Sequence, residues 1–183
     1  FRTNPKHRLA QNAVTQTTAD DVALDREIVN GSDFSFSTEL DNWSVTNQKK
    51  SGRCWMFAAL NLLRTSAMKS MNVKAFEFSQ NYTLFWDKFE RSNFFLEEII
   101  TSTDRAVDDR LVAYMLGDPL SDGGQWNMAM NIIRKHGLVP KTAMPESESS
   151  SNTRRMNANL KYVLRQGARD LRAAFRDGIP ASE

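Results

Sequence analysis

The chain has 183 residues, a formal net charge of +2 at pH 7, and 40% apolar residues that include four tryptophans. This length suits one domain with a sizeable core, and the near balance of charge singles out neither nucleic acid nor an acidic surface as a partner. No apolar run approaches the roughly 20 residues that a membrane span requires, and the single cysteine excludes an intramolecular disulfide.

The N-terminal residues show no secretory signal, because the first seven lead directly into polar sequence. Together with the lone cysteine, this predicts a cytoplasmic protein in a reducing compartment. Residues 1–16 are polar and predict an arm. Thr18 is placed to cap a short helix that ends near Gly31, and the weak alternation from Ser32 to Leu40 predicts an extended segment.

The middle of the chain predicts four helices. The first runs from Cys54 to about Met71, and its apolar residues lie on more than one side, which predicts deep burial. Ser79 is a suitable N-cap for a second helix that continues to about Ile100. Its aromatic side chains are interpreted as core and helix contacts, in preference to base stacking: Tyr82, Phe85, Trp86, Phe89, Phe94 and Phe95. Two shorter helices are predicted over residues 108–116 and 122–135.

After Lys141 the character of the sequence changes. Residues 146–152 are rich in serine and glutamate and predict a flexible linker. Residues 153–176 predict a helix with seven lysines and arginines and a modest apolar stripe. The favoured interpretation is a solvated helix that packs on a part of the protein outside this chain, and the alternative is a nucleic-acid or assembly surface.

The most informative stretch surrounds Cys54, the only cysteine. The thiol falls where a helix begins, and unpaired amides with the helix macrodipole favour negative charge there, which favours a thiolate. Gln48 lies six residues upstream. Its side-chain amide could donate a hydrogen bond to an oxyanion that forms beside the sulfur.

These residues resemble the active-site segment of papain-like cysteine peptidases, through Gln48, Ser51, Gly52, Cys54, Trp55 and Phe57. The wider string from Thr46 to Trp55 is similar to a narrower branch, the bleomycin hydrolases and bacterial aminopeptidase C enzymes. Further stretches resemble that branch: residues 77–80, 85–88, 122–126 and 144–147. In secreted members of the wider family, half-cystines stand where this chain has Ser51 and Ser121, which agrees with a cytosolic relative.

The resemblance implies a mainly α chain, the helical subdomain of an α+β papain-like fold whose β-rich subdomain is missing. It divides the chain into an arm with a short helix (1–40), the helical subdomain with the nucleophile (41–147), and a linker with a basic helix that starts a family insertion (148–183). Cys54 would be the nucleophile, and Gln48 would contribute to the oxyanion hole. Gly123 and Gly124, with Asp122, would bind an extended peptide substrate like an added strand.

Two smaller expectations concern the same region. Asp122 is also a candidate N-cap for the helix that follows it, and Trp126 is expected to pack against the protein. Trp55 is expected to pack beneath the site. The resemblance further implies a homohexamer that acts on peptides, and no metal or cofactor is predicted.

A cysteine peptidase also needs a histidine and a group that orients it. The chain has only two histidines, His7 in the polar arm and His136 at the predicted end of a helix, and neither lies in a matching motif. The chain is therefore predicted to carry the nucleophile half of a site and to be inactive alone.

Three functions stay open at this point. The first is the N-terminal part of a cytosolic cysteine aminopeptidase that hydrolyses peptide bonds through a thioester. The second is a non-catalytic assembly or nucleic-acid-binding module that uses the basic C-terminal helix. The third is a related thiol enzyme, such as an acyltransferase, which an amine acceptor would distinguish from a peptidase.

Overall fold

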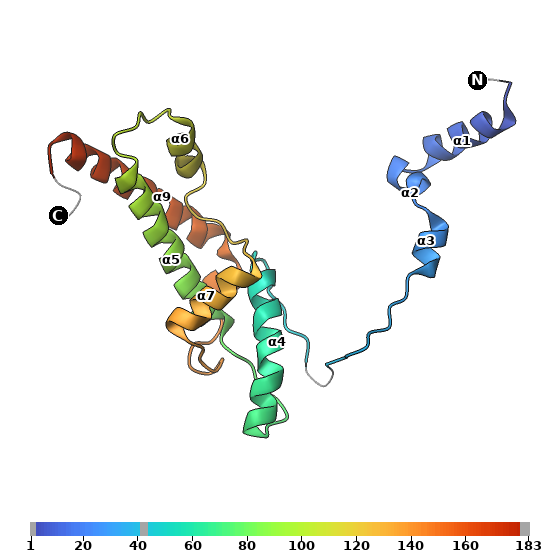
Figure 1. Ribbon diagram of the computed structural model, residues 1–183, viewed down its shortest axis with the longest axis horizontal. Coiled ribbons are helices and arrows are strands. Elements are labelled where there is room, and N and C mark those ends of the chain that lie inside the picture. The colour runs from blue at the N-terminus through green and yellow to red at the C-terminus, as the bar shows by residue number, and fades with distance from the viewer. Residues whose placement is uncertain (1–2, 41–43, 180–183) are drawn as a thin grey trace. The chain divides into compact units, whose positions relative to one another are not determined.

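Helices make up nearly all of the regular structure (Figure 1). The computed structural model describes residues 3–40 and 44–179. The predicted boundary between residues 40 and 41 lies at the edge of the described part, because residues 41–43 are outside it. Within that part there is no β-strand, and only two isolated bridges occur, Lys50 with Asn152 and Phe78 with Pro140. The prediction of a mainly α chain is therefore confirmed. Two compact units are present, residues 1–41 and 42–183, and each is described by itself.

The first unit contains three short helices whose side chains are all at least partly exposed: α1 (Pro5–Gln16), α2 (Ala19–Ala23) and α3 (Arg26–Gly31). The predicted polar arm is thus largely helical, because Asn4 caps α1 and Pro5 occupies its first turn. The single helix expected after Thr18 is two helices. Leu24 has an extended backbone, and Asp25 caps the second one with its carboxylate. The predicted extended segment at residues 32–40 contains no helix or strand.

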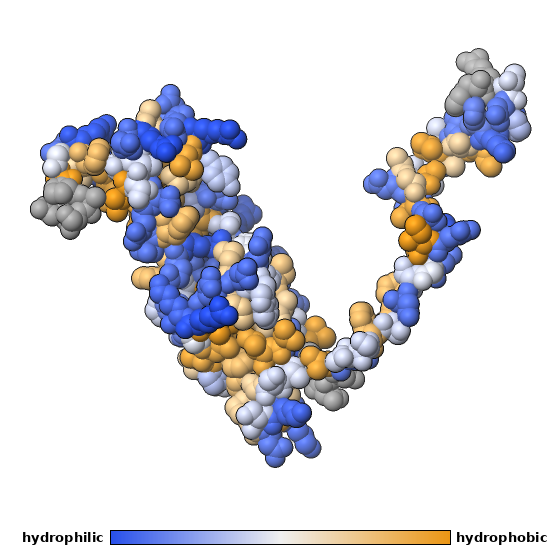
Figure 2. Space-filling view, viewed as in Figure 1, coloured by the Kyte–Doolittle hydropathy of each residue, from blue (hydrophilic) through white to orange (hydrophobic). Residues whose placement is uncertain are grey.

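The central helix α4 (Cys54–Met71) has the predicted bounds. It ends where Asn72 takes a left-handed conformation, with φ of 53°. The prediction of deep burial is wrong for much of its second half. Leu62 is 50% exposed and Met71 48%, and Figure 2 shows a hydrophobic area over this helix. The buried residues of the helix are Met56, Phe57, Ala59 and Leu60 in its first turns and Arg64 further along.

The main core lies between α5 (Gln80–Thr101) and α9 (Thr153–Arg176), which run side by side (Figure 1). Ser79 caps α5 as predicted, by accepting a hydrogen bond from the backbone N–H of Tyr82. The core consists of Phe95, Ile99, Leu120, Leu164 and Ala168. The basic helix therefore packs on α5 of this same chain, and the prediction that its packing partner lies elsewhere is wrong.

The aromatic side chains of α5 are only partly in this core. Phe95 is buried, whereas Phe85, Phe89 and Phe94 are each more than half exposed. Trp86 instead stacks on His136, with ring centroids 3.8 Å apart. The interpretation of the series as core and helix contacts is therefore confirmed for Phe95, which is in the core, and for Trp86, which contacts α7, whereas the three exposed rings are not part of the core.

Three shorter helices complete the second unit: α6 (Arg110–Gly117), α7 (Trp126–His136) and α8 (Glu148–Ser151). The predicted linker at residues 146–152 is mostly α8, whose Ser147 and Ser150 form a capping box, with Ser150 buried. Helix α7 begins at Trp126, later than predicted, and its N-cap is Gln125. In the described ranges no helix is both long and apolar enough to cross a membrane.

Candidate active site

Cys54 is the first residue of α4 and its side chain is exposed. The residue before it, Arg53, is the N-cap, and no side chain caps the helix there. The backbone carbonyl of Arg53 accepts from the amides of Met56 and Phe57, at 2.9 and 3.0 Å. The thiol therefore lies at the positive end of an 18-residue helix, where a thiolate is stabilised.

Gln48 lies in the loop that leads into α4. It is half-buried, and its Oε1 is enclosed without a hydrogen-bond partner among the residues the structure describes. A sharp turn follows it, because Lys49 has a φ of 56° and donates its N–H to Asn47 Oδ1 at 2.8 Å. No hydrogen bond from the described residues therefore fixes the side-chain oxygen of Gln48.

The backbone of this loop is attached to the junction between α8 and α9. The amide of Lys50 donates to the carbonyl of Ser151 at 2.9 Å, and the amide of Thr153 donates to the carbonyl of Lys50 at 3.3 Å. These two bonds join segments about 100 residues apart in sequence, and they position the loop that carries Gln48.

A buried ion pair lies directly beside the nucleophile. Arg53 has no exposed surface, and its two terminal nitrogens donate to the two carboxylate oxygens of Glu146 at 2.9 and 2.8 Å. Its Nε donates to Ser51 Oγ at 2.8 Å, and the guanidinium lies over the ring of Phe57. Burial raises the pKa of Glu146, but the hydrogen bonds from Arg53 and Ser150 outweigh that effect and keep the pKa below its usual value.

Asp122 is a second junction, and it contacts three separate parts of the chain. Its carboxylate accepts from the amide of Gly52 at 3.2 Å, from Lys88 Nζ on α5 at 2.5 Å, and from Thr153 and Asn157 on α9. Burial raises the pKa of Asp122, but the bonds from Lys88, Thr153 and Asn157 outweigh it and hold the pKa well below its usual range. Asp122 therefore does not cap α7, and that prediction is wrong, because these donors occupy its carboxylate.

The glycine pair lies against the start of α4. A Cβ on Gly124 would come within 2.4 Å of the Trp55 ring, and the indole Nε1 of Trp55 donates to the carbonyl of Asp122 at 2.8 Å. The carbonyl of Gly123 accepts from Arg91 Nη2 at 2.5 Å. Since Trp55 follows Cys54 directly, these contacts bring the predicted substrate-binding residues to the end of the helix that bears the thiol.

His136 is engaged by residues other than those around Cys54. His136 is the last residue of α7, as predicted, and it stacks on Trp86 while its Nε2 lies 2.6 Å from Glu90 Oε1. His7 belongs to α1 in the first unit.

Trp126 is 49% exposed, so the expectation that it packs is wrong for about half of its surface. Across residues 3–40 and 44–179 there is no group of three acidic, histidine or cysteine side chains that could hold a metal ion.

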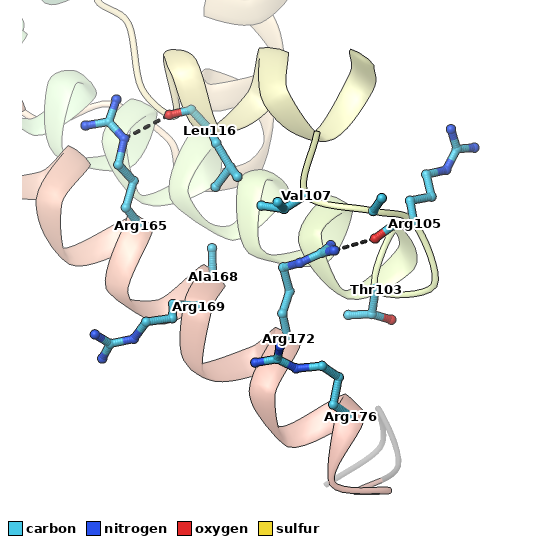
Figure 3. A pocket seen from close by; sticks show the side chains of 10 residues that line it. Thr103, Arg105, Val107, Leu116, Arg165, Ala168, Arg169, Arg172 and Arg176 are labelled. Atoms are coloured by element: carbon cyan, nitrogen blue, oxygen red, sulfur yellow. Dashed lines mark hydrogen bonds between the residues drawn. The ribbon is translucent and has the colours of Figure 1, made fainter. Parts of the chain in front are cut away.

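A pocket of about 690 Å³ lies away from Cys54, between α9 and the segment that joins α5 to α6 (Figure 3). Two of its arginines donate hydrogen bonds to backbone carbonyls. Arg165 donates to Leu116 and Gly117, both at 2.8 Å, and Arg172 donates to Ser102 and Arg105. Figure 3 shows the Arg169 side chain extending away from Arg172. Arg165 thus binds the end of α6, Arg172 binds the segment after α5, and Arg169 pairs with its neighbour Asp170.

Sequence reasoning missed Arg53 and Glu146 as residues of the site. Arg53 was visible beside the cysteine, but its partner lies 93 residues further along the chain, and no local spacing links them. The only available signal was the similarity of residues 144–147 to the same enzyme branch.

Comparison with known proteins identifies the family of this chain. Over all 183 residues the chain matches the Peptidase C1-like family. It is 51% identical over 151 residues to aminopeptidase C of Lactobacillus delbrueckii subsp. lactis, covering 82% of this chain and 34% of that protein. It is 42% identical to bleomycin hydrolase of Oryctolagus cuniculus, over 98% of this chain and 66% of that protein.

A solved structure shows the same arrangement of helices. The crystal structure of pepw from Lactobacillus rhamnosis superimposes with a TM-score of 0.85 at 42% sequence identity, covering 99% of this chain and 41% of that one. The chain thus spans less than half of pepw and about a third of the Lactobacillus delbrueckii aminopeptidase. Since the family match extends over its whole length, this chain belongs to the Peptidase C1-like family.

Proposed function

We propose that this chain is the nucleophile-bearing part of a cysteine aminopeptidase. The Cys54 sulfur attacks the carbonyl carbon of a peptide bond, so that a C–S bond forms and the carbonyl oxygen becomes an oxyanion. When the C–N bond breaks, the amine leaves with the proton that the Cys54 thiol gave up to a histidine outside this chain, and a thioester remains. Water then hydrolyses the thioester, which releases the acid and restores the thiol. The backbone amide of Cys54 and the side chain of Gln48 donate to the oxyanion.

One observation carries this proposal. The contact between Gly124 and the Trp55 ring brings the Gly123–Gly124 backbone to the helix end where Cys54 lies exposed. A peptide paired with that backbone in an extended conformation would present a carbonyl near the thiol. The aminopeptidase C and bleomycin hydrolase relatives support the same chemistry for the whole protein.

The histidine and asparagine that complete such a site are proposed to come from a part of the protein outside this chain, because His136 is engaged by Trp86 and Glu90. The 183-residue chain alone is accordingly proposed to be inactive. For the whole protein we propose a cytoplasmic homohexamer with peptide substrates, on the resemblance of its sequence to that enzyme branch.

The test uses the full-length protein that contains this chain and a fluorogenic aminoacyl amide. Cys54→Ala should lower turnover at least 10³-fold, because nucleophile loss leaves only the residual effect of binding and the oxyanion hole. Ser66→Ala is the matched control, since Ser66 is exposed on the same helix and should leave turnover within about twofold. Turnover that survives Cys54→Ala would refute the proposed function.

A second variant tests the oxyanion donor. Gln48→Ala should lower kcat about 10²–10³-fold and leave KM nearly unchanged, because the oxyanion exists only in the transition state. Lys50→Ala, two residues further along the same loop, serves as its control because the loop contacts of Lys50 are made by its backbone. A kcat that is equal in the two variants would contradict the role given to Gln48.

A further inference from the structure

We infer that Ser51, Arg53 and Glu146 form a relay that positions Gln48 for catalysis; this inference rests on the proposed function. The relay is a continuous chain of hydrogen bonds. Ser51 Oγ donates to the backbone carbonyl of Gln48 at 2.6 Å and accepts from Arg53 Nε at 2.8 Å. Arg53 is in turn bound through both terminal nitrogens by Glu146. None of the three side chains takes part in making or breaking a bond; their role is to position Gln48.

The far end of the relay is fixed by α8. The carboxylate of Glu146 accepts from Ser150 Oγ at 2.7 Å, and Ser150 is buried within the capping box that starts this helix. Bidentate pairing fixes both the distance and the plane of a guanidinium relative to its carboxylate. Arg53 is fully enclosed and also lies over the Phe57 ring, so its position is determined on every side.

The near end of the relay is the part of the loop that most needs support. The residue after Gln48 has a left-handed backbone, which is unfavourable for lysine, and the Gln48 Oε1 has no partner among the described residues. The local structure therefore does not determine the position of the Gln48 amide by itself. The bond from Ser51 to the Gln48 carbonyl supplies the missing constraint, because it ties the loop to the same residue, Arg53, that precedes the nucleophile.

Such a role predicts a particular kinetic signature. An oxyanion donor acts in the transition state, and a small displacement of a catalytic group is costly to kcat. Loss of the Ser51 hydroxyl should therefore lower kcat and leave KM nearly unchanged. The loss should be smaller than that caused by removing the Gln48 amide itself, because a displaced donor still makes part of its interaction.

The test is a double-mutant cycle on the full-length enzyme, with Ser51→Ala, Gln48→Ala and the double variant. We expect Ser51→Ala to lower kcat about tenfold, with KM within about twofold, when Gln48 is present. In the Gln48→Ala background the same change should lower kcat by less than about twofold, because the group it positions is gone. Ser121→Ala is the matched control, since it also removes one serine hydroxyl near the site but lies outside the relay.

Thermal midpoints are recorded for all four variants. Equal losses of kcat from Ser51→Ala in both backgrounds would overturn the relay, as would a lower thermal midpoint with kcat unchanged. Glu146→Gln is a second test of the relay, because it keeps the shape of the side chain but weakens its binding to Arg53. It should lower kcat when Gln48 is present and have little effect on kcat in the Gln48→Ala background. If turnover instead survives Cys54→Ala, the proposed function fails and not the relay alone.

Discussion

Two partly buried carboxylates connect the start of α4 to distant parts of the chain, and they do so in different ways. The arginine anchor consists of Ser51, Arg53 and Glu146, and it supports the loop before the nucleophile. The aspartate anchor consists of Lys88, Asp122, Thr153 and Asn157, and it supports Gly52 and the glycine pair.

The difference lies in how each charge is compensated. In the arginine anchor, one carboxylate satisfies both terminal nitrogens of a guanidinium with no exposed surface. In the aspartate anchor, one carboxylate receives donors from a lysine, a threonine, an asparagine and a backbone amide. Removing one partner should therefore lower the free energy of unfolding strongly in the arginine anchor and moderately in the aspartate anchor. The variants below test that contrast.

The largest effect is expected for Glu146→Ala. The change leaves the guanidinium of Arg53 buried without its carboxylate, and breaking a buried pair in this way typically costs about 3–5 kcal/mol. Chemical denaturation of the full-length protein, followed by tryptophan fluorescence, should show the loss. Glu148→Ala is the control, because Glu148 is exposed only two residues away and should cost under about 1 kcal/mol. Similar losses in both variants would contradict the contrast.

A smaller effect is expected for Lys88→Met in the aspartate anchor. The substitution removes the bonds from Lys88 Nζ to the carboxylate of Asp122 and to the carbonyl of Ser121. Three donors to Asp122 remain, and the methionine fills a similar volume, so roughly 1–3 kcal/mol of unfolding free energy should be lost. The same denaturation measurement applies. A loss larger than that of Glu146→Ala would show that the lysine dominates this anchor.

The helices were the part of the fold that the sequence could predict. The bounds of α4 and α9 follow from local features, namely the apolar pattern after Cys54 and the long basic segment after Asn152. Residues 146–152 were predicted to be a flexible linker but contain α8, and the reason is physical. Their composition is polar, and polarity alone cannot show that Glu146 will be enclosed by an arginine on another element.

The candidate site was predictable only as a set of residues. The motif identified Cys54, Gln48 and the glycine pair, but Asp122 was assigned to the wrong partner. Its position before a helix suggested a cap, and capping is a local interaction. In the structure Lys88, Thr153 and Asn157 compete for the same carboxylate from distant elements. Tertiary hydrogen bonds of this kind leave no spacing in the sequence.

The aspartate anchor should also show in the pH dependence of stability. The folded-state pKa of Asp122 is lower than the ordinary value of 3.8, so ionised Asp122 stabilises the fold above that pH, and this contribution is lost as the pH falls toward the folded-state pKa. One such carboxylate changes the unfolding free energy by at most about 1.4 kcal/mol per pH unit.

The variant Asp122→Asn separates this contribution from the others. It should be less stable than the parent protein at pH 6, and its stability should fall less steeply between pH 4 and pH 2, because the titrating group is gone. Urea midpoints measured over that range decide the point. Glu146 has a lowered pKa as well, so some acid dependence should persist in the variant. A slope identical to that of the parent would place the acid sensitivity elsewhere.

The smallest effects are expected among the arginines of α9, where burial again decides the outcome. Arg172 donates to the carbonyls of Ser102 and Arg105, so Arg172→Ala leaves these acceptors without that donor and should cost about 1 kcal/mol. Arg169 is 70% exposed and pairs with the neighbouring Asp170, which is also exposed, so Arg169→Ala should change stability by less than about 0.5 kcal/mol. Raising the salt concentration should not alter the Arg172 effect, since carbonyl acceptors carry no net charge to be screened. The opposite outcome is a loss of stability that is equal in the two variants and that changes with salt. It would mean that long-range charge, and not hydrogen bonding to backbone carbonyls, determines how these side chains contribute to stability.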